Sequence, residues 1–162
     1  VGFALAELLH REGARLLVCD IDSTKVEKAR RLFGAEPITP DHYFSTECHI
    51  LAPCGLGGIL NDSTLPSLNC DIVAGSANNQ LAEARHGQWL HDHGILYAPD
   101  YVINAGGLIT VSLGHLHKSA DIIRSKTWCI GETLTTIFKR AQADNLPTSV
   151  IADQMAQDIL YH

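Results

Sequence analysis

Apolar residues in the first 104 positions alternate between two patterns. Short, mostly apolar runs bounded by turn residues are typical of buried strands. They occupy residues 15–19, 48–53, 72–74 and 95–98, and a short edge strand is predicted at 36–38. Helical spacing of apolar positions predicts helices at residues 3–10, 24–33 and 81–93. Strands that alternate with helices predict an α/β fold with a doubly wound parallel sheet.

The pattern changes after Asn104, where helical spacing replaces the strands. Helices are predicted at about 105–122, 126–144 and 148–160. Thr148 follows Pro147 and is a suitable first residue for the last of them. The sequence therefore predicts a domain at residues 1–104 and a set of C-terminal helices at 105–162 that pack on it.

Two segments rich in glycine and asparagine follow predicted strands. They are Gly75-Ser76-Ala77-Asn78-Asn79-Gln80 and Pro99-Asp100-Tyr101-Val102-Ile103-Asn104-Ala105-Gly106-Gly107. Parallel strands end at one edge of a sheet, so the amides of Asn78 and Asn104 would be available to a ligand lying across that edge. The glycines at 55, 57 and 58 would likewise let the backbone approach a ligand. Plain turns are the alternative interpretation of all three segments.

The amino-terminal residues match the second half of a dinucleotide-binding unit. Gly2 precedes a predicted helix and then a strand that ends at Asp20. A complete unit needs a strand and a Gly-x-Gly sequence before Val1, so we expect the chain to begin inside this motif, with its first strand and the start of its glycine-rich loop missing. Asp20 could accept both hydroxyls of an adenosine ribose, which favours NAD over NADP. The alternative is that Asp20 caps the helix that begins near Ser23.

Composition and charge restrict the function further. The 162 residues are 46% hydrophobic and 19% charged, as in an ordinary globular domain. A net charge of −6 gives no electrostatic reason to bind nucleic acid or an anionic membrane. No apolar run approaches the roughly 20 residues of a membrane helix. The five cysteines are odd in number and lack a Cys-x-x-Cys spacing, which favours reduced thiols in a cytoplasmic protein.

Other candidate groups do not predict a site. Cys54 has no histidine at a spacing that implies nucleophilic catalysis. The pairs His91/His93 and His115/His117 resemble metal ligands, but residues i and i+2 of a helix point apart, so we predict no metal site. A catalytic acid–base group cannot be identified either, and we place no catalytic residue within this chain.

Three sequence blocks together closely resemble one group of enzymes. The blocks are Ala52–Gly58, Gly75–Leu81 and Tyr97–Gly107. They resemble the leucine, phenylalanine, valine and tryptophan dehydrogenases, in the superfamily that also contains glutamate dehydrogenase. The resemblance runs from Val1 to about Leu160 and includes Asp144-Asn145-Leu146-Pro147-Thr148. It implies a Rossmann-type fold that binds NAD.

The resemblance also assigns roles to residues at the expected edge of the sheet. The residues it implies in cofactor binding are Gly2, Asp20, Ile21, Cys54, Gly55, Ala77, Asn78 and Asn104. Gly2 would end the phosphate-binding loop, and Asp20 would bind the adenosine ribose. The loops at Cys54 and Asn78 would line the nicotinamide ribose. Asn104 would lie near both the nicotinamide and the substrate.

The activity implied is the reversible oxidative deamination of a branched-chain or aromatic L-amino acid to a 2-keto acid and ammonia. In such enzymes a lysine and an aspartate of an N-terminal domain transfer the protons, and neither lies in this sequence. We therefore expect this stretch alone to be inactive and to need that domain as a partner, in a homo-oligomer. The C-terminal helices 105–162 would face the cleft between the two domains.

Two other functions fit parts of the sequence. One is a non-catalytic dinucleotide-binding regulatory module, and the other is a hydroxy-acid dehydrogenase, which would need a histidine partnered by an acid. The sequence also departs from the family at Leu108-Ile109-Thr110-Val111 and over residues 112–127. Because these helices shape the substrate pocket in the family, the departures leave the choice of amino acid open.

Overall fold

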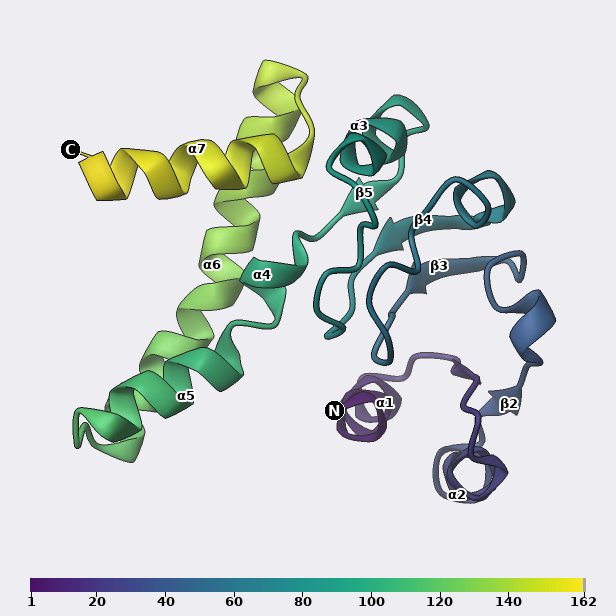
Figure 1. Cartoon of the computed structure of the whole chain (residues 1–162). Helices are drawn as coiled ribbons and strands as arrows, with labels where there is room; N and C mark the ends of the chain where they lie inside the picture. Colours follow the sequence, from purple (N-terminus) through teal and green to yellow (C-terminus); the bar gives the residue numbers. More distant parts are fainter. Residues whose placement is uncertain (162) are drawn as a thin grey trace.

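The computed structural model describes residues 1–161 as parallel strands with flanking helices, followed by a set of C-terminal helices (Figure 1). The helices are α1 (Gly2–Arg11), α2 (Ser23–Phe33), α3 (Arg85–Asp92), α4 (Asp100–Ile103), α5 (Gly106–His115), α6 (Ala120–Asp144) and α7 (Thr148–Tyr161). The strands are β1 (Leu17–Val18), β2 (Glu36–Pro37), β3 (Cys48–Leu51), β4 (Cys70–Val73) and β5 (Leu96–Tyr97). The predicted α/β class is confirmed.

The strands form two parallel sheets. β1 pairs with β2, and Leu17 lies opposite Glu36. β4 lies between β3 and β5, and its Ile72 lies opposite Ile50 and Leu96. Within residues 1–161, β1 and β3 each pair with one strand only, so each has an unpaired edge. This is the arrangement that a doubly wound sheet without its first strand would have.

Helix ends follow the local sequence signals. The Asp22 carboxylate accepts a hydrogen bond from the Thr24 N–H at 3.0 Å, which caps α2, and Gly34 ends that helix with a left-handed φ of 64°. Ser119 caps α6 by accepting from the Ile122 N–H, and Asn145 ends it with φ 52°. Both helices therefore begin at a polar side-chain cap and end at a residue with left-handed backbone.

Two apolar clusters hold the described residues together. The first joins the three-stranded sheet to α3 and consists of Leu51, Leu60, Leu65, Val73, Leu90 and Tyr97. The second joins α6 to α7 and consists of Ile137, Ala141, Ile151 and Ala152. The Thr148 hydroxyl donates to the Tyr97 carbonyl at 2.6 Å, which ties the start of α7 to the end of β5. Between residues 1 and 161 no helix is long and apolar enough to cross a membrane.

The break between the first two C-terminal helices was predicted in the wrong place. α5 ends at His115 rather than near 122, and α6 begins at Ala120 rather than near 126. His117 adopts a left-handed φ of 52°, which ends helical backbone, and Ser119 then caps the next helix. The cap signal at Ser119 was present in the sequence and was overlooked.

Two other segments also differ from prediction. Helix α3 begins at Arg85 rather than 81, because Leu81 instead forms a parallel bridge with Leu60. Asp100–Ile103, predicted as loop, forms the short helix α4. Pro99 precedes α4 with an extended ψ of 124°, so the chain turns into a helix directly after β5.

Candidate functional site

The loops that leave β3, β4 and β5 touch one another at the carboxyl edge of the sheet. A Cβ atom added to Gly75, after β4, would lie 2.1 Å from the carbonyl oxygen of Pro53, after β3. A Cβ atom on Gly57 would lie 2.5 Å from the carbonyl oxygen of Asn78. Both distances are far below a van der Waals contact, so the close approach of these backbones requires glycine.

The two predicted amides meet. The Asn104 Nδ2 donates to the Asn78 Oδ1 at 2.7 Å, although the residues are 26 positions apart. Asn78 lies in the exposed loop after β4, and Asn104 is the half-buried C-cap of α4. This bond uses one donor and one acceptor, and the remaining amide groups can pair with a ligand that both donates and accepts.

The amino terminus of α1 lies against the same edge. A Cβ atom on Gly2 would lie 3.1 Å from the Cβ of Cys54 and 3.6 Å from its sulfur. A helix N-terminus presents unpaired backbone N–H groups, which suit an anionic phosphate. Cys54 is a half-buried free thiol, and Gly55 beside it is exposed with open space at its Cβ position.

Asp20 does not cap α2, so that alternative interpretation was wrong. Its Oδ1 accepts from the Asp22 N–H at 2.9 Å, and Asp22 is the residue that caps the helix. Ile21 is 100% exposed. A surface hollow beside the first turns of α2 is lined by Asp20, Ile21, Ser23, Thr24, Val26, Glu27, Lys28 and Arg31. Asp20 thus lies in the lining of this hollow, where its Oδ1 is also 3.9 Å from the Lys25 Nζ.

Ala77 contacts the neighbouring loop through its backbone rather than its side chain. It is buried, and its N–H donates to the Pro53 carbonyl at 2.9 Å. Gln80 is also buried, and its Nε2 donates to the carbonyls of Gly75 and Ala77 at 2.9 and 3.0 Å. The loop that carries Asn78 is therefore held from both sides.

Asp100 was not predicted as a site residue. This acid is only 8% exposed and accepts hydrogen bonds from the Asn79 N–H at 2.6 Å and from the Tyr97 hydroxyl at 2.8 Å. The one available signal was an acid directly after a strand that ends in Tyr97 and a proline. Because Asn79 is 21 residues away from Asp100, the sequence could not show that the carboxylate is buried.

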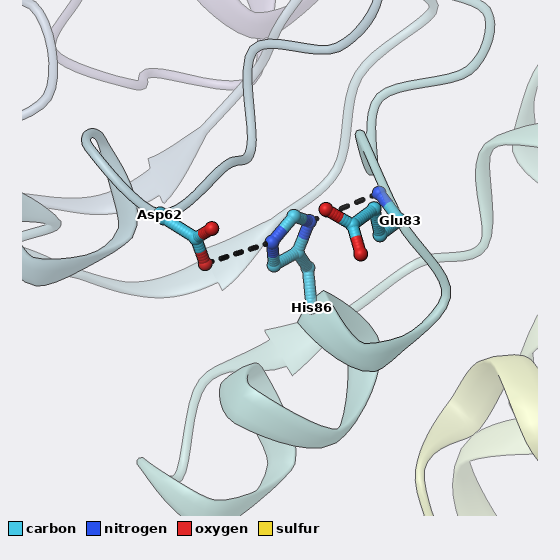
Figure 2. Close-up of side chains that lie close together, drawn as sticks. All are labelled: Asp62, Glu83 and His86. Atoms are coloured by element: carbon cyan, nitrogen blue, oxygen red, sulfur yellow. Dashed lines mark hydrogen bonds and ion pairs between the residues drawn. The ribbon is translucent and has the colours of Figure 1, made fainter.

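Four other polar residues form a cluster between the loop after β3 and α3, which we call the Arg85 cluster: Asp62, Glu83, Arg85 and His86. His86 is buried, and its Nδ1 accepts from the Glu83 N–H at 3.0 Å, so its Nε2 carries the proton that faces Asp62 at 3.2 Å (Figure 2). The Arg85 guanidinium donates to both carboxylates, with distances of 2.6 to 3.1 Å. The Arg85 guanidinium therefore already neutralises the carboxylates that could otherwise bind a cation.

The Arg85 cluster should stabilise the fold in a pH-dependent way. Hydrogen bonds from Arg85 and then His86 lower the pKa of Asp62. A carboxyl whose pKa is lower in the folded state stabilises it above the unfolded pKa of about 3.9, and this is lost as pH falls through the folded value. Arg85→Gln is therefore expected to lower the melting temperature by up to about 3 °C at pH 7 and by less at pH 3.

Thermal unfolding of the parent and the variant at both pH values measures this difference. The control is Arg124→Gln, which removes an exposed arginine outside the ion pairs of the described residues. It should change the melting temperature equally at both pH values. If Arg85→Gln lowers the melting temperature as much at pH 3 as at pH 7, the ion pair between Arg85 and Asp62 is not the source of the stabilisation.

The two histidine pairs and the cysteines other than Cys54 add nothing to this site. All five cysteines are free thiols. His93 stacks on Trp89 with ring centroids 3.6 Å apart, and its Nδ1 lies 2.8 Å from the Trp89 carbonyl oxygen, a local helix-end contact. His115 and His117 are exposed at the end of α5. Neither histidine pair contributes to the Asn78–Asn104 site.

Comparison with known proteins gives consistent matches over nearly the whole chain. The sequence model described as glutamate/leucine/phenylalanine/valine dehydrogenase matches residues 1–150. Leucine dehydrogenase of Thermoactinomyces intermedius is 46% identical over 158 residues, which is 98% of this chain and 43% of that protein. L-tryptophan dehydrogenase of Nostoc punctiforme is 43% identical over 159 residues, 98% of this chain and 45% of that protein.

Solved structures agree with these matches. The crystal structure of L-tryptophan dehydrogenase from Nostoc punctiforme superposes with a TM-score of 0.93 at 42% identity, over 96% of this chain and 46% of that one. A hetero-hexameric glutamate dehydrogenase from Thermus thermophilus shares the fold, with a TM-score of 0.69 at 21% identity, over 94% of this chain and 41% of that one. The chain spans less than half the length of the relatives that it matches.

Proposed function

Because the chain belongs to the glutamate/leucine/phenylalanine/valine dehydrogenase family, we propose that it is the NAD-binding part of an L-amino-acid dehydrogenase. The observation that carries this proposal is the 2.7 Å hydrogen bond between Asn78 and Asn104, in the segments that follow the neighbouring parallel strands β4 and β5. Ligands of open α/β sheets bind outside the carboxyl ends of the strands. Family membership favours this function over a hydroxy-acid dehydrogenase.

The residues at this edge fit a dinucleotide. Gly2 would admit the pyrophosphate at the amino terminus of α1, where a Cβ atom would meet Cys54 at 3.1 Å. Asp20 would accept from the adenosine ribose with Oδ2, an atom that makes no hydrogen bond among the described side chains. Ile21, fully exposed beside it, would cover one face of the adenosine. The backbones of Gly55 and Ala77 would line the nicotinamide ribose.

The amide pair would orient the reacting atoms. The chemistry that a bound nicotinamide would supply is to accept a hydride from the α-carbon of the amino acid. Asn104, fixed by Asn78, would hold the substrate or the carboxamide so that the α-carbon faces the ring. The imine that results is hydrolysed to the 2-keto acid and ammonia. We place the groups that transfer protons in the rest of the protein, which the described chain lacks.

An apolar helix face follows the amide pair and suits an apolar substrate side chain. Leu108 and Val111 are 74% and 72% exposed and lie one turn apart on α5, which begins two residues after Asn104. We propose that residues 105–162 face the cleft toward the missing domain and that the substrates are branched-chain or aromatic amino acids. A homo-oligomeric state and a cytoplasmic location stay predictions.

The full-length protein should oxidise such amino acids with NAD. The measurement is the rise in near-ultraviolet absorbance of NADH with leucine, valine, phenylalanine and tryptophan as substrates. Residues 1–162 alone are the matched control and should give no turnover. A full-length protein that binds NAD but turns over none of these amino acids would instead support the non-catalytic regulatory module.

The role of Asp20 can be tested separately. Asp20→Ser removes the carboxylate that would pair with the adenosine ribose, so the KM for NAD should rise about tenfold, and the preference for NAD over NADP should fall. Steady-state kinetics with both cofactors measures the two effects. The control Asp22→Ser makes the same change two residues away and keeps a side chain that can cap α2. Equal effects of the two substitutions would show that Asp20 only shapes the turn.

A further inference from the structure

Asp100 is a buried acid at the start of α4. Its side chain is held by a backbone N–H and a phenol, at 2.6 Å from Oδ2 to the Asn79 nitrogen and 2.8 Å from Oδ1 to the Tyr97 oxygen. Among the side chains of residues 1–161, no lysine, arginine or histidine forms an ion pair with it. Burying a carboxylate is costly unless every lone pair is used, so a residue of this kind needs a reason beyond packing.

The two bonds of this carboxylate join the loops that carry the amide pair. One goes to the N–H of Asn79, the residue after Asn78. Asn79 has a left-handed φ of 51°, which an asparagine adopts only at some cost in free energy. The Asp100 carbonyl in turn accepts from the Asn104 N–H at 3.0 Å. Asp100 therefore contacts the backbone on both sides of the Asn78–Asn104 hydrogen bond.

Tyr97 fixes the carboxylate from the opposite side. Its side chain is 2% exposed, and its hydroxyl lies between Oδ1 and the Asp100 N–H, which donates to it at 3.2 Å. The Thr148 hydroxyl holds the Tyr97 carbonyl at 2.6 Å. Hydrogen bonds of Thr148, Tyr97 and Asp100 thus link the start of α7 and the end of β5 to the loop that carries Asn78.

We propose that Asp100 is a positioning residue that sets the geometry of the Asn78–Asn104 pair toward the nicotinamide and the amino acid. This inference rests on the proposed dehydrogenase function. The carboxylate touches neither ligand and acts through Asn79 and the helix that ends at Asn104. Its loss would leave the cofactor site assembled but would misalign the amide that orients the substrate.

The test uses two substitutions in the full-length protein. Asp100→Asn keeps the size of the side chain but replaces one acceptor oxygen with an NH₂ group, which would face the Asn79 N–H or the Tyr97 hydroxyl, both of them donors. Tyr97→Phe removes only the hydroxyl that fixes Oδ1 and should fold in any case. Each is expected to lower kcat about tenfold with the Kd for NADH changed less than about threefold, because misplacement affects hydride transfer more than binding. The isotope effect from α-deuterated substrate should increase.

Tyr101→Phe is the matched control. It makes the same chemical change four residues away, where the hydroxyl bonds Asp153 at 2.6 Å and the Ser149 carbonyl at 3.2 Å rather than Asp100. It should leave kcat within about twofold of the parent. In the double variant Tyr97→Phe/Asp100→Asn, the losses should be less than multiplicative, since both substitutions break one network.

Three outcomes would overturn the proposal. They are an unchanged kcat in Tyr97→Phe, an equal loss in Tyr101→Phe, and a parallel loss of NADH affinity and kcat. Activity of the parent is measured first. A parent without turnover on any amino acid refutes the proposed function itself, whereas an active parent with unaffected variants refutes only the role of Asp100.

Discussion

Asn104→Ala in the full-length protein should lower kcat/KM for the amino acid about a hundredfold while changing the Kd for NADH only a few-fold. The alanine removes the amide that donates to Asn78 Oδ1 at 2.7 Å and that would orient the substrate. The helix should tolerate the change, because Asn104 is a C-cap with an ordinary φ of −93°. NAD would keep its contacts at Gly2, Asp20 and the loop at Cys54.

Steady-state kinetics and NADH fluorescence titration measure the two quantities. The control is Asn69→Ala, an exposed asparagine directly before β4 and thus at the opposite end of that strand. Asn69→Ala should leave kcat/KM for the amino acid and the Kd for NADH within about twofold of the parent values. Equal loss of turnover and NADH binding in Asn104→Ala would mean that the residue is structural.

Gly75→Ala should destabilise the fold by about 4 kcal/mol, which is larger than the effect of most substitutions. The new Cβ would lie 2.1 Å from the Pro53 oxygen and 2.4 Å from its nitrogen. Neither backbone can move away, because Ala74 N–H donates to the Leu51 carbonyl and Ala77 N–H to the Pro53 carbonyl, both at 2.9 Å. Relief of the clash would break these bonds, and with them the support of Asn78.

Denaturant unfolding of the parent and variant measures the loss. Gly131→Ala is the matched control, since Gly131 lies within α6 with open space where its Cβ would be. This substitution should stabilise the helix by up to about 1 kcal/mol. A Gly75→Ala protein as stable as the parent would show that the two loops do not pack as described.

Local sequence signals were sufficient for most of the secondary structure. The strands around Ile72 and Leu96 and the ends of α2 were found because apolar runs, a polar cap and a terminal glycine act within a few residues. Leu81 was misassigned because its pairing with Leu60 is not local. The break at Ser119 was missed although a cap marked it.

The candidate site was predictable only in part. Asn78 and Asn104 could be selected because each follows a strand, and parallel strands share an edge. Their hydrogen bond needs the backbone to turn at α4, which no sequence signal indicated. Asp20 could be selected, but the sequence left open whether it caps a helix, and only the contact between Asp22 and Thr24 decided this.

The sequence by itself determined an α/β chain whose polar residues gather after its strands, because alternating apolar patterns and turn residues act over short distances. Only the tertiary structure decided that Gly2 lies against Cys54, that Gly75 crosses Pro53 and that the Asp100 carboxylate is buried. These features depend on contacts between residues 3 to 52 positions apart in the sequence. Side-chain burial and backbone crossing are properties of the assembled edge, so no single stretch of sequence carries them.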